Sequence, residues 1–193
     1  MPGPVAAQRR DSLSLVSGGG TVWLTGLPSA GKTTIAQALA DRLRADDRAV
    51  EVLDGDETRP VLSPELGYSR ADRDANVARV GWVARLLARN GVLVLASLVS
   101  PYTAARDGVR QWHESAGVPF FEIHVATPVE VCSQRDVKGL YARQRDGHLA
   151  GLTGIDGDYE PPASPDLRID TSGQPLDDSV EELLALLQKE MSS

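Results

Sequence analysis

Short apolar runs recur along the chain and alternate with segments in which apolar residues return every three or four positions. The runs predict five strands, at Val22–Thr25, Val50–Leu53, Val92–Leu98, Phe120–Val125 and Leu167–Ile169. The other periodicity predicts helices at about residues 33–45, 71–89, 103–115, 128–136 and 177–190. Strands that alternate with helices imply crossover connections. The fold class is therefore α/β, with a central parallel sheet and helices on both faces.

A glycine-rich segment follows the first predicted strand. Its sequence, Gly26-Leu27-Pro28-Ser29-Ala30-Gly31-Lys32-Thr33, is a complete G-x-x-x-x-G-K-[ST] phosphate-binding loop, and a helical pattern starts at Thr34. In such a loop, backbone N–H groups surround the phosphate oxygens, the lysine reaches the β- and γ-phosphates, and the hydroxyl contacts Mg²⁺. Because the flanking strand and helix are of the required type, the loop predicts nucleotide binding.

Two aspartates end the second predicted strand, in Leu53-Asp54-Gly55-Asp56. A carboxylate at this place can face the phosphate loop, hold Mg²⁺ through water, or accept a proton from an attacking hydroxyl. The alternative is a simple turn, because Asp-Gly is typical of turns. Since ligands gather at the carboxyl ends of the strands in such sheets, we expect at least one aspartate to act in the site.

Phosphoryl transfer requires mainly positioning and charge stabilisation, so an acceptor pocket should offer cations and hydrogen bonds. Arg59 follows Asp56 by three residues, and Arg73 and Asn76 share one helix face at i,i+3 spacing. Ser100, directly after the third predicted strand, could form another wall of this pocket. The alternatives are a solvated helix face with surface ion pairs and a serine N-cap followed by proline.

Residues 137–162 combine the basic side chains Lys138, Arg143 and Arg145 with several glycines and little hydrophobic periodicity. Such a segment is typical of a lid that closes over a phosphate site and excludes water, although a plain surface loop is the alternative. The sequence predicts a flexible N-terminal arm at residues 1–19, which leads into the run Gly18-Gly19-Gly20. We expect residues 20–193 to form a single domain.

The formal net charge of −7 argues against nucleic acid or an anionic membrane as the main partner. No apolar run approaches the length of a membrane span. Cys132 is the only cysteine, which excludes an intramolecular disulfide and a cysteine-built metal site. We expect Cys132 to pack as a small apolar residue and the protein to work in the reducing cytoplasm.

An ordered set of segments, taken together, resembles the adenylylsulfate (APS) kinase family of P-loop kinases. The resemblance runs from about Thr21 to Thr171 with the family's spacing. Beyond the phosphate loop and Leu53–Asp56, the matching segments are Leu66-Gly67-Tyr68-Ser69, Asp72-Arg73, Asn76, Val99-Ser100-Pro101-Tyr102, Arg106-Asp107, Glu130-Val131-Cys132, Arg135-Asp136, Lys138-Gly139-Leu140-Tyr141, Thr153-Gly154-Ile155-Asp156 and Tyr159-Glu160-Pro161-Pro162. The phosphate loop alone is generic, whereas the ordered set is specific.

The resemblance implies a three-layer P-loop NTPase fold and a kinase that converts APS and ATP, with Mg²⁺, to PAPS and ADP in sulfate assimilation. It implies a small-molecule partner, APS, and a possible homodimer. The implied ATP-binding residues are Gly26, Leu27, Pro28, Ser29, Ala30, Gly31, Lys32, Thr33 and Thr34, and the metal-binding residues are Thr33, Asp54 and Asp56. The implied catalytic residues are Lys32, Asp56 and Ser100. The implied APS-binding residues are Asp56, Arg59, Tyr68, Arg73, Asn76, Val99, Ser100, Lys138, Gly151 and Leu152.

The serine equivalent to Ser100 is often described in this family as a phosphoserine intermediate. Direct in-line attack by the sugar hydroxyl, with Asp56 as base or as ligand of a metal-bound water, needs no protein nucleophile. We therefore expect Ser100 to be a site residue without a covalent role.

Several positions of the implied acceptor pocket depart from the family. Glu57 stands where asparagine is usual, and Leu98 and Leu152 stand where the family has phenylalanine. These changes leave open a kinase of the same fold for another hydroxylated metabolite, such as a nucleoside, a sugar or an antibiotic. A non-catalytic nucleotide-binding regulator is the further alternative, although Lys32 and Asp54 argue against it.

Overall fold

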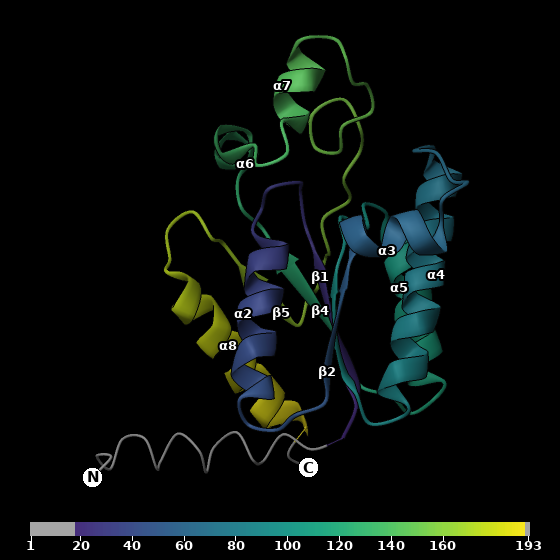
Figure 1. Ribbon diagram of the computed structural model, residues 1–193, viewed down its shortest axis with the longest axis vertical. Coiled ribbons are helices and arrows are strands. Elements are labelled where there is room, and N and C mark those ends of the chain that lie inside the picture. Colours follow the sequence, from purple (N-terminus) through teal and green to yellow (C-terminus); the bar gives the residue numbers. More distant parts are fainter. Residues whose placement is uncertain (1–17, 192–193) are drawn as a thin grey trace.

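The computed structural model describes residues 18–191, so the predicted arm lies outside the described residues except for Gly18 and Gly19. The strands are β1 (Gly20–Thr25), β2 (Val50–Asp54), β3 (Leu93–Ser97), β4 (Phe120–Val125) and β5 (Leu167–Ile169). They form one sheet in the order β2-β3-β1-β4-β5, and every neighbouring pair is parallel (Figure 1). The predicted strands and the parallel sheet are confirmed.

The predicted helices are confirmed as α2 (Lys32–Arg44), α4 (Arg70–Ala88), α5 (Thr103–Glu114), α6 (Val129–Arg135) and α8 (Leu176–Met191). The structure adds two helices that the sequence pattern did not predict. These are α3 (Gly55–Leu62) and α7 (Leu140–Arg145), and α7 lies inside the segment expected to be a lid without periodic structure.

Both additional helices are short. Each begins where a nearby carboxylate accepts hydrogen bonds from backbone N–H groups, and neither has a wide apolar face. No residue of α3 is buried, and its N-terminus is fixed by the Asp54 side chain, which accepts a hydrogen bond of 2.8 Å from the Asp56 N–H. The Asp136 carboxylate accepts hydrogen bonds from the N–H groups of Tyr141 and Ala142 at the start of α7. Hydrophobic periodicity could not reveal either helix, because neither has a wide apolar stripe to bury.

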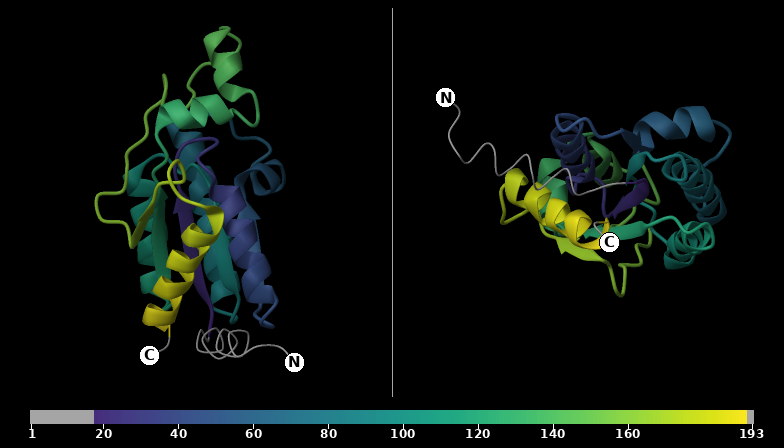
Figure 2. Two further views of the ribbon diagram at one scale, coloured as in Figure 1. Left: turned by 90° about the vertical axis from the view of Figure 1, so that its left-hand side faces the viewer. Right: turned by 90° about the horizontal axis from the view of Figure 1, so that it is seen from below.

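The sheet separates two hydrophobic cores. Helices α2 and α8 cover one face of the sheet, and α4 and α5 cover the other (Figures 1 and 2). Side chains alternate along β1, so Val22 and Leu24 pack in the core beneath α2 and α8, whereas Trp23 packs in the core beneath α4 and α5. The alternation in β3 is the same, with Leu95 in the first core and Val94 in the second. Residues of parallel strands are buried on both faces, which explains the continuous apolar runs in the sequence.

The carboxyl ends of all five strands lie at one edge of the sheet, and the loops with the predicted site residues leave from this edge. Helices α6 and α7 and the loop after them stand above the same edge (Figures 1 and 2). The topology thus brings together segments that are far apart in the sequence, as expected for the ligand site of an open parallel sheet.

Within residues 18–191, no helix is both long enough and apolar enough to cross a membrane. Cys132 is fully buried and belongs to the core beneath α2 and α8, which confirms the expectation that it packs as an apolar residue.

The contact between α4 and α5 generates a testable prediction. A Cβ atom on Gly81 of α4 would lie 2.4 Å from a methyl carbon of Val109, whereas a Cβ on Gly108 of α5 would meet no atom within 4 Å. We expect Gly81→Ala to lower the free energy of unfolding by about 1–3 kcal/mol, because the helices must separate. Gly108→Ala should raise it by about 0.5–1 kcal/mol, because alanine favours helix.

Urea denaturation of both variants measures these two changes. Val109→Ala should recover much of the loss when it is combined with Gly81→Ala. Equal effects of the two glycine substitutions would contradict this account of the packing of α4 on α5.

Candidate active site

A cleft of about 880 Å³ lies at the carboxyl edge of the sheet. The phosphate loop, the ends of β2 and β3, helix α4 and the predicted lid segment all contribute to its walls. The ten residues expected to contact an acceptor all line it: Asp56, Arg59, Tyr68, Arg73, Asn76, Val99, Ser100, Lys138, Gly151 and Leu152. The structure therefore brings the predicted phosphate loop and the predicted acceptor residues into one cavity.

The phosphate loop lies against β4, and a glycine makes this approach possible. Gly26 has a φ of +152°, and a Cβ at this position would lie 2.3 Å from the Val125 carbonyl oxygen. Pro28, Ser29 and Gly31–Thr34 line the cleft, whereas Gly26, Leu27 and Ala30 do not. The Ala30 carbonyl accepts hydrogen bonds of 2.9 Å from the hydroxyls of Thr127 and Thr171, which hold the loop on the ends of β4 and β5.

The Lys32 ammonium lies inside the loop. It donates hydrogen bonds of 2.9 and 2.8 Å to the carbonyls of Gly26 and Leu27, and only 8% of the residue is exposed. Burial, with a smaller contribution from the Lys138 charge, lowers the pKa of Lys32 to about 8. Asp54 and Asp56 offset part of this effect, and a polyphosphate in the cleft would add more negative charge next to the buried cation.

Thr33, Asp54 and Ser97 form a polar group next to Lys32. The Thr33 hydroxyl donates a hydrogen bond of 2.6 Å to the Asp54 carboxylate and lies 3.3 Å from the Ser97 hydroxyl. One carboxylate and one hydroxyl fit Mg²⁺, which prefers oxygen ligands and takes the others from water and from substrate phosphates. Among residues 18–191, no cluster of three or more acidic, histidine or cysteine side chains offers a metal site built by protein alone.

In the acceptor half of the cleft, two arginines face one exposed aromatic ring. The guanidinium of Arg59 lies 4.7 Å from the centre of the Tyr68 ring, and that of Arg73 lies 5.6 Å from it. Arg73 also donates hydrogen bonds to the Gly151 carbonyl (2.9 Å) and to the Thr153 hydroxyl (3.0 Å), which join α4 to the predicted lid. These cations can bind an anionic substrate, and the ring can stack on a flat one.

Asn76 and Ser100 are buried polar residues that line the same half. Among residues 18–191, no group pairs with the Oδ1 atom of Asn76, although buried amide oxygens are normally paired, so this atom is available to a ligand. The Ser100 hydroxyl accepts a hydrogen bond of 3.1 Å from Trp23 Nε1, and its own hydrogen remains for an acceptor in the cleft. Asn76 lies on α4 with Arg73, so the i,i+3 pair does face the cleft.

The predicted lid segment contacts both halves of the cleft. Lys138 forms an ion pair with Asp56, and the Tyr141 hydroxyl donates a hydrogen bond of 3.0 Å to the Pro28 carbonyl of the phosphate loop. The turn at Gly151 is ordered by Asp156, whose pKa is lowered because its carboxylate accepts backbone hydrogen bonds, first of all from Gly151. Of the three basic residues predicted there, Lys138 and Arg143 line the cleft and Arg145 does not.

The residues that depart from the family pattern lie in different places. Leu98 and Leu152 line the cleft and are almost fully buried, so each fills space with an aliphatic side chain. Glu57 is exposed on α3 and does not line the cleft.

Some cleft residues were not identified from the sequence. Ser97 next to Thr33 could have been found because it ends the strand β3, where ligands are expected. Arg135 donates hydrogen bonds of 2.7 and 2.8 Å to Thr171, and both residues line the cleft beside the phosphate loop. Gln174 and Leu176 extend this wall. The pairing of Arg135 with Thr171 could not be predicted from the spacing of motif residues in the sequence, because the two residues lie far apart in the chain.

Comparison with known proteins agrees with this geometry. The adenylylsulphate kinase family model matches residues 18–170. A protein of Synechocystis sp. named "Probable adenylyl-sulfate kinase" is 51% identical over 162 residues, which cover 84% of this chain and 89% of that protein. The adenylyl-sulfate kinase of Gloeothece citriformis is 49% identical over 89% of this chain and 95% of its own. The structure of the Mycobacterium tuberculosis APS kinase in complex with AMPPNP and APS superposes with a TM-score of 0.85 at 42% identity, covering 88% of this chain and 98% of that one.

The buried ammonium of Lys32 generates a prediction about stability and pH. Because its pKa is about 8 in the folded protein and 10.5 when unfolded, the unfolded chain binds more protons between these values, and stability rises with pH there. Without nucleotide, we expect Lys32→Met to be more stable than the wild type at pH 7 by on the order of 1–3 kcal/mol. This advantage should shrink between pH 8 and 10.5, and the variant should lose the stabilisation that added ATP gives the wild type.

Urea denaturation at pH 7 and pH 10, with and without ATP, measures each of these effects. A stability difference between Lys32→Met and the wild type that does not change with pH would contradict the assignment of a buried, charged Lys32.

Proposed function

The chain belongs to the adenylylsulphate kinase family, and on that premise we propose that it transfers the γ-phosphoryl group of ATP to the 3′-hydroxyl of APS, giving PAPS and ADP. The observation that carries the proposal is a shared cavity. One cleft is lined both by the phosphate loop and by the acceptor residues Arg59, Tyr68, Arg73 and Asn76. A nucleotide polyphosphate and a second, anionic nucleotide can therefore meet within it.

We assign the phosphate-loop side of the cleft to ATP. Lys32 would exchange its two loop carbonyls for the β- and γ-phosphate oxygens, which compensate its buried charge better than neutral carbonyls do. Backbone N–H groups at the start of α2 add further donors for the phosphates. Arg135, Thr171 and Gln174 would then border the nucleoside part of ATP, because they line the wall beside the loop.

We assign the opposite wall to APS. The guanidinium groups of Arg59 and Arg73 would pair with its phosphosulfate oxygens, and the Tyr68 ring would stack on its adenine. The Oδ1 atom of Asn76 accepts hydrogen bonds, so it suits a ribose hydroxyl or the adenine amino group.

Transfer needs no covalent protein intermediate. The APS 3′-oxygen attacks the γ-phosphorus as the bond to the β–γ bridging oxygen breaks, and the hydroxyl proton leaves to a base. Asp56 is our candidate base: its carboxylate is exposed in the cleft and leaves its ion pair with Lys138 when substrate enters. Lys138 is then free to stabilise charge on the transferred group. Ser100 contributes a hydrogen bond from its buried position.

Thr33 and Asp54 would hold Mg²⁺, with Asp56 acting through water, and the ion would neutralise charge on the β- and γ-phosphates. The Thr33 hydroxyl and the Asp54 carboxylate already lie together at the end of β2, so this pair needs no rearrangement to share a ligand. The reducing cytoplasm is our proposed location, because the only cysteine, Cys132, is a buried free thiol.

The experiment that tests the proposed function measures ADP release with ATP, Mg²⁺ and micromolar APS, with an APS-free control. We expect turnover that depends on APS and yields PAPS as the product. Binding of ATP without APS-dependent turnover would contradict the proposal. A panel of nucleosides, sugars and antibiotics would then identify another acceptor.

A second experiment tests the acceptor wall. Removing Arg73 takes away a charged hydrogen-bond donor, which contributes about 1.5–3 kcal/mol, so Arg73→Ala should raise the KM for APS by roughly 10- to 100-fold. The KM for ATP should change little. Arg79→Ala is the matched control, since Arg79 lies on the same helix but pairs with the exposed Glu65 outside the cleft. An Arg73→Ala enzyme with wild-type kinetics for both substrates would remove Arg73 from the site.

A further inference from the structure

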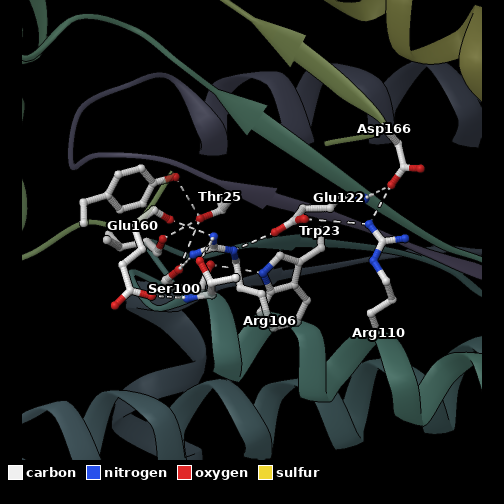
Figure 3. A network of polar contacts seen from close by, with 11 residues as sticks. Trp23, Thr25, Ser100, Arg106, Arg110, Glu122, Glu160 and Asp166 are labelled. Atoms are coloured by element: carbon white, nitrogen blue, oxygen red, sulfur yellow. Dashed lines mark hydrogen bonds and ion pairs between the residues drawn. The ribbon is translucent and has the colours of Figure 1, made fainter. Parts of the chain in front are cut away.

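A buried arginine outside the cleft joins the structural elements that form the acceptor wall. Arg106 lies on α5 and is 1% exposed. Figure 3 shows its guanidinium among Ser100, Glu122 and Glu160. It donates hydrogen bonds of 2.6 Å to the Glu122 carboxylate, 2.7 Å to the Ser100 carbonyl and 2.7 Å to the Glu160 carbonyl. One side chain thus connects β4, the loop after β3 and the end of the predicted lid.

The Ser100 backbone requires such support. Its φ of +40° is in a region that residues other than glycine rarely adopt, and such a conformation persists only where the surroundings fix it. Arg106 holds the Ser100 carbonyl, the Thr25 hydroxyl donates a hydrogen bond of 2.7 Å to the Val99 carbonyl, and Trp23 holds the Ser100 hydroxyl. Of these three hydrogen-bond donors, Arg106 is the charged one.

The end of the predicted lid is joined to the same loop through Glu160. The Glu160 N–H donates a hydrogen bond of 2.8 Å to the Pro101 carbonyl, next to Ser100 in the chain. The Glu160 carboxylate accepts a hydrogen bond of 2.8 Å from the Thr103 N–H at the start of α5, and it pairs with Arg70 of α4 at 3.2 Å. These contacts place the lid end directly on the Ser100 loop.

The charge of Arg106 is balanced locally. Glu122 is 6% exposed, and its carboxylate also lies 3.7 Å from Arg110, which pairs with Asp166 at 2.8 Å. An arginine keeps its charge at every ordinary pH, so the buried guanidinium needs the Glu122 carboxylate. Arg110 shares this carboxylate but contacts neither Ser100 nor Glu160, as Figure 3 illustrates. It is therefore a matched comparison for Arg106.

We propose that Arg106 is a positioning residue, which holds the Ser100 loop in its acceptor-binding conformation and fixes the end of the lid to it. The inference rests on the proposed function, because the loop forms the wall assigned to APS. Arg106 touches no substrate. It acts through the carbonyls of Ser100 and Glu160, so its loss should affect the acceptor and not ATP.

Steady-state kinetics separates this role from a general loss of structure. Arg106→Met should raise the KM for APS at least 10-fold and leave the KM for ATP within twofold of the wild type. Arg106→Lys should have an intermediate effect, because an ammonium cannot reach all three acceptors with the planar geometry of a guanidinium. Arg110→Met should leave both KM values within twofold. Equal increases for both substrates, or the same acceptor effect in Arg110→Met, would overturn the proposal.

A second variant covers the case in which Arg106→Met fails to fold because the buried Glu122 keeps only its longer ion pair with Arg110. Arg106→Met/Glu122→Gln removes that charge while it keeps the size of the side chain. We expect it to show the same selective increase in the KM for APS. A folded double variant with wild-type KM values would contradict the positioning role.

A measurement without APS distinguishes failure of this inference from failure of the proposed function. Trp82 and Trp112 are partly exposed, so Trp82→Phe/Trp112→Phe leaves the buried Trp23 as the only tryptophan, bonded to Ser100. In this background, Arg106→Met should shift the Trp23 emission and Arg110→Met should not. An unchanged emission would overturn the role of Arg106 even if APS proves to be the substrate. If the emission shifts as expected but the wild type has no APS-dependent turnover, only the proposed function is refuted.

Discussion

The burial of one ammonium group determines how the rest of the site is arranged. Lys32 lies inside the phosphate loop, where its hydrogen-bond partners within the described part of the chain are two neutral carbonyls, and burial lowers its pKa to about 8. The fold tolerates this burial because the loop is held from behind, by Gly26 packed against Val125 and by hydroxyls from the ends of two strands. The protein thus maintains a positive site that is stabilised most when polyphosphate is present.

The predicted lid connects the two halves of the cleft. Its contacts reach the phosphate loop through Tyr141, the strand-end carboxylate Asp56 through Lys138, and helix α4 through Gly151, which binds Arg73. Because several of these contacts use groups that we assign to substrates, substrate binding and rearrangement of this segment are expected to be coupled. Such coupling would exclude water from the reacting phosphate and limit hydrolysis of ATP.

The strands and long helices could be predicted from the sequence because each of them buries a continuous run or a regular stripe of apolar residues. The phosphate loop could be located because its glycines and Lys32 have fixed spacing. Helix α3 was missed because it has no buried residue, and the wall at Arg135 because its partner Thr171 lies on a distant segment. The left-handed backbone of Ser100 could not be predicted either, since it depends on tertiary contacts and not on local preference.

The separation of the two cores by the sheet has an evolutionary consequence. The helices beneath which Val22 and Leu24 pack support the nucleotide wall, whereas the core around Trp23 and Leu98 supports the part of the acceptor wall formed by α4 and the end of β3. Leu152 is the acceptor-wall residue that packs in the first of these cores. A substitution in one core changes the packing of its own layer first, because the backbone of the sheet stands between them. Divergence of acceptor preference can therefore proceed through the second core without repacking the core beneath α2 and α8, whereas a change at Leu152 affects that core as well. Leu98, on the acceptor side, is a position at which such divergence could accumulate.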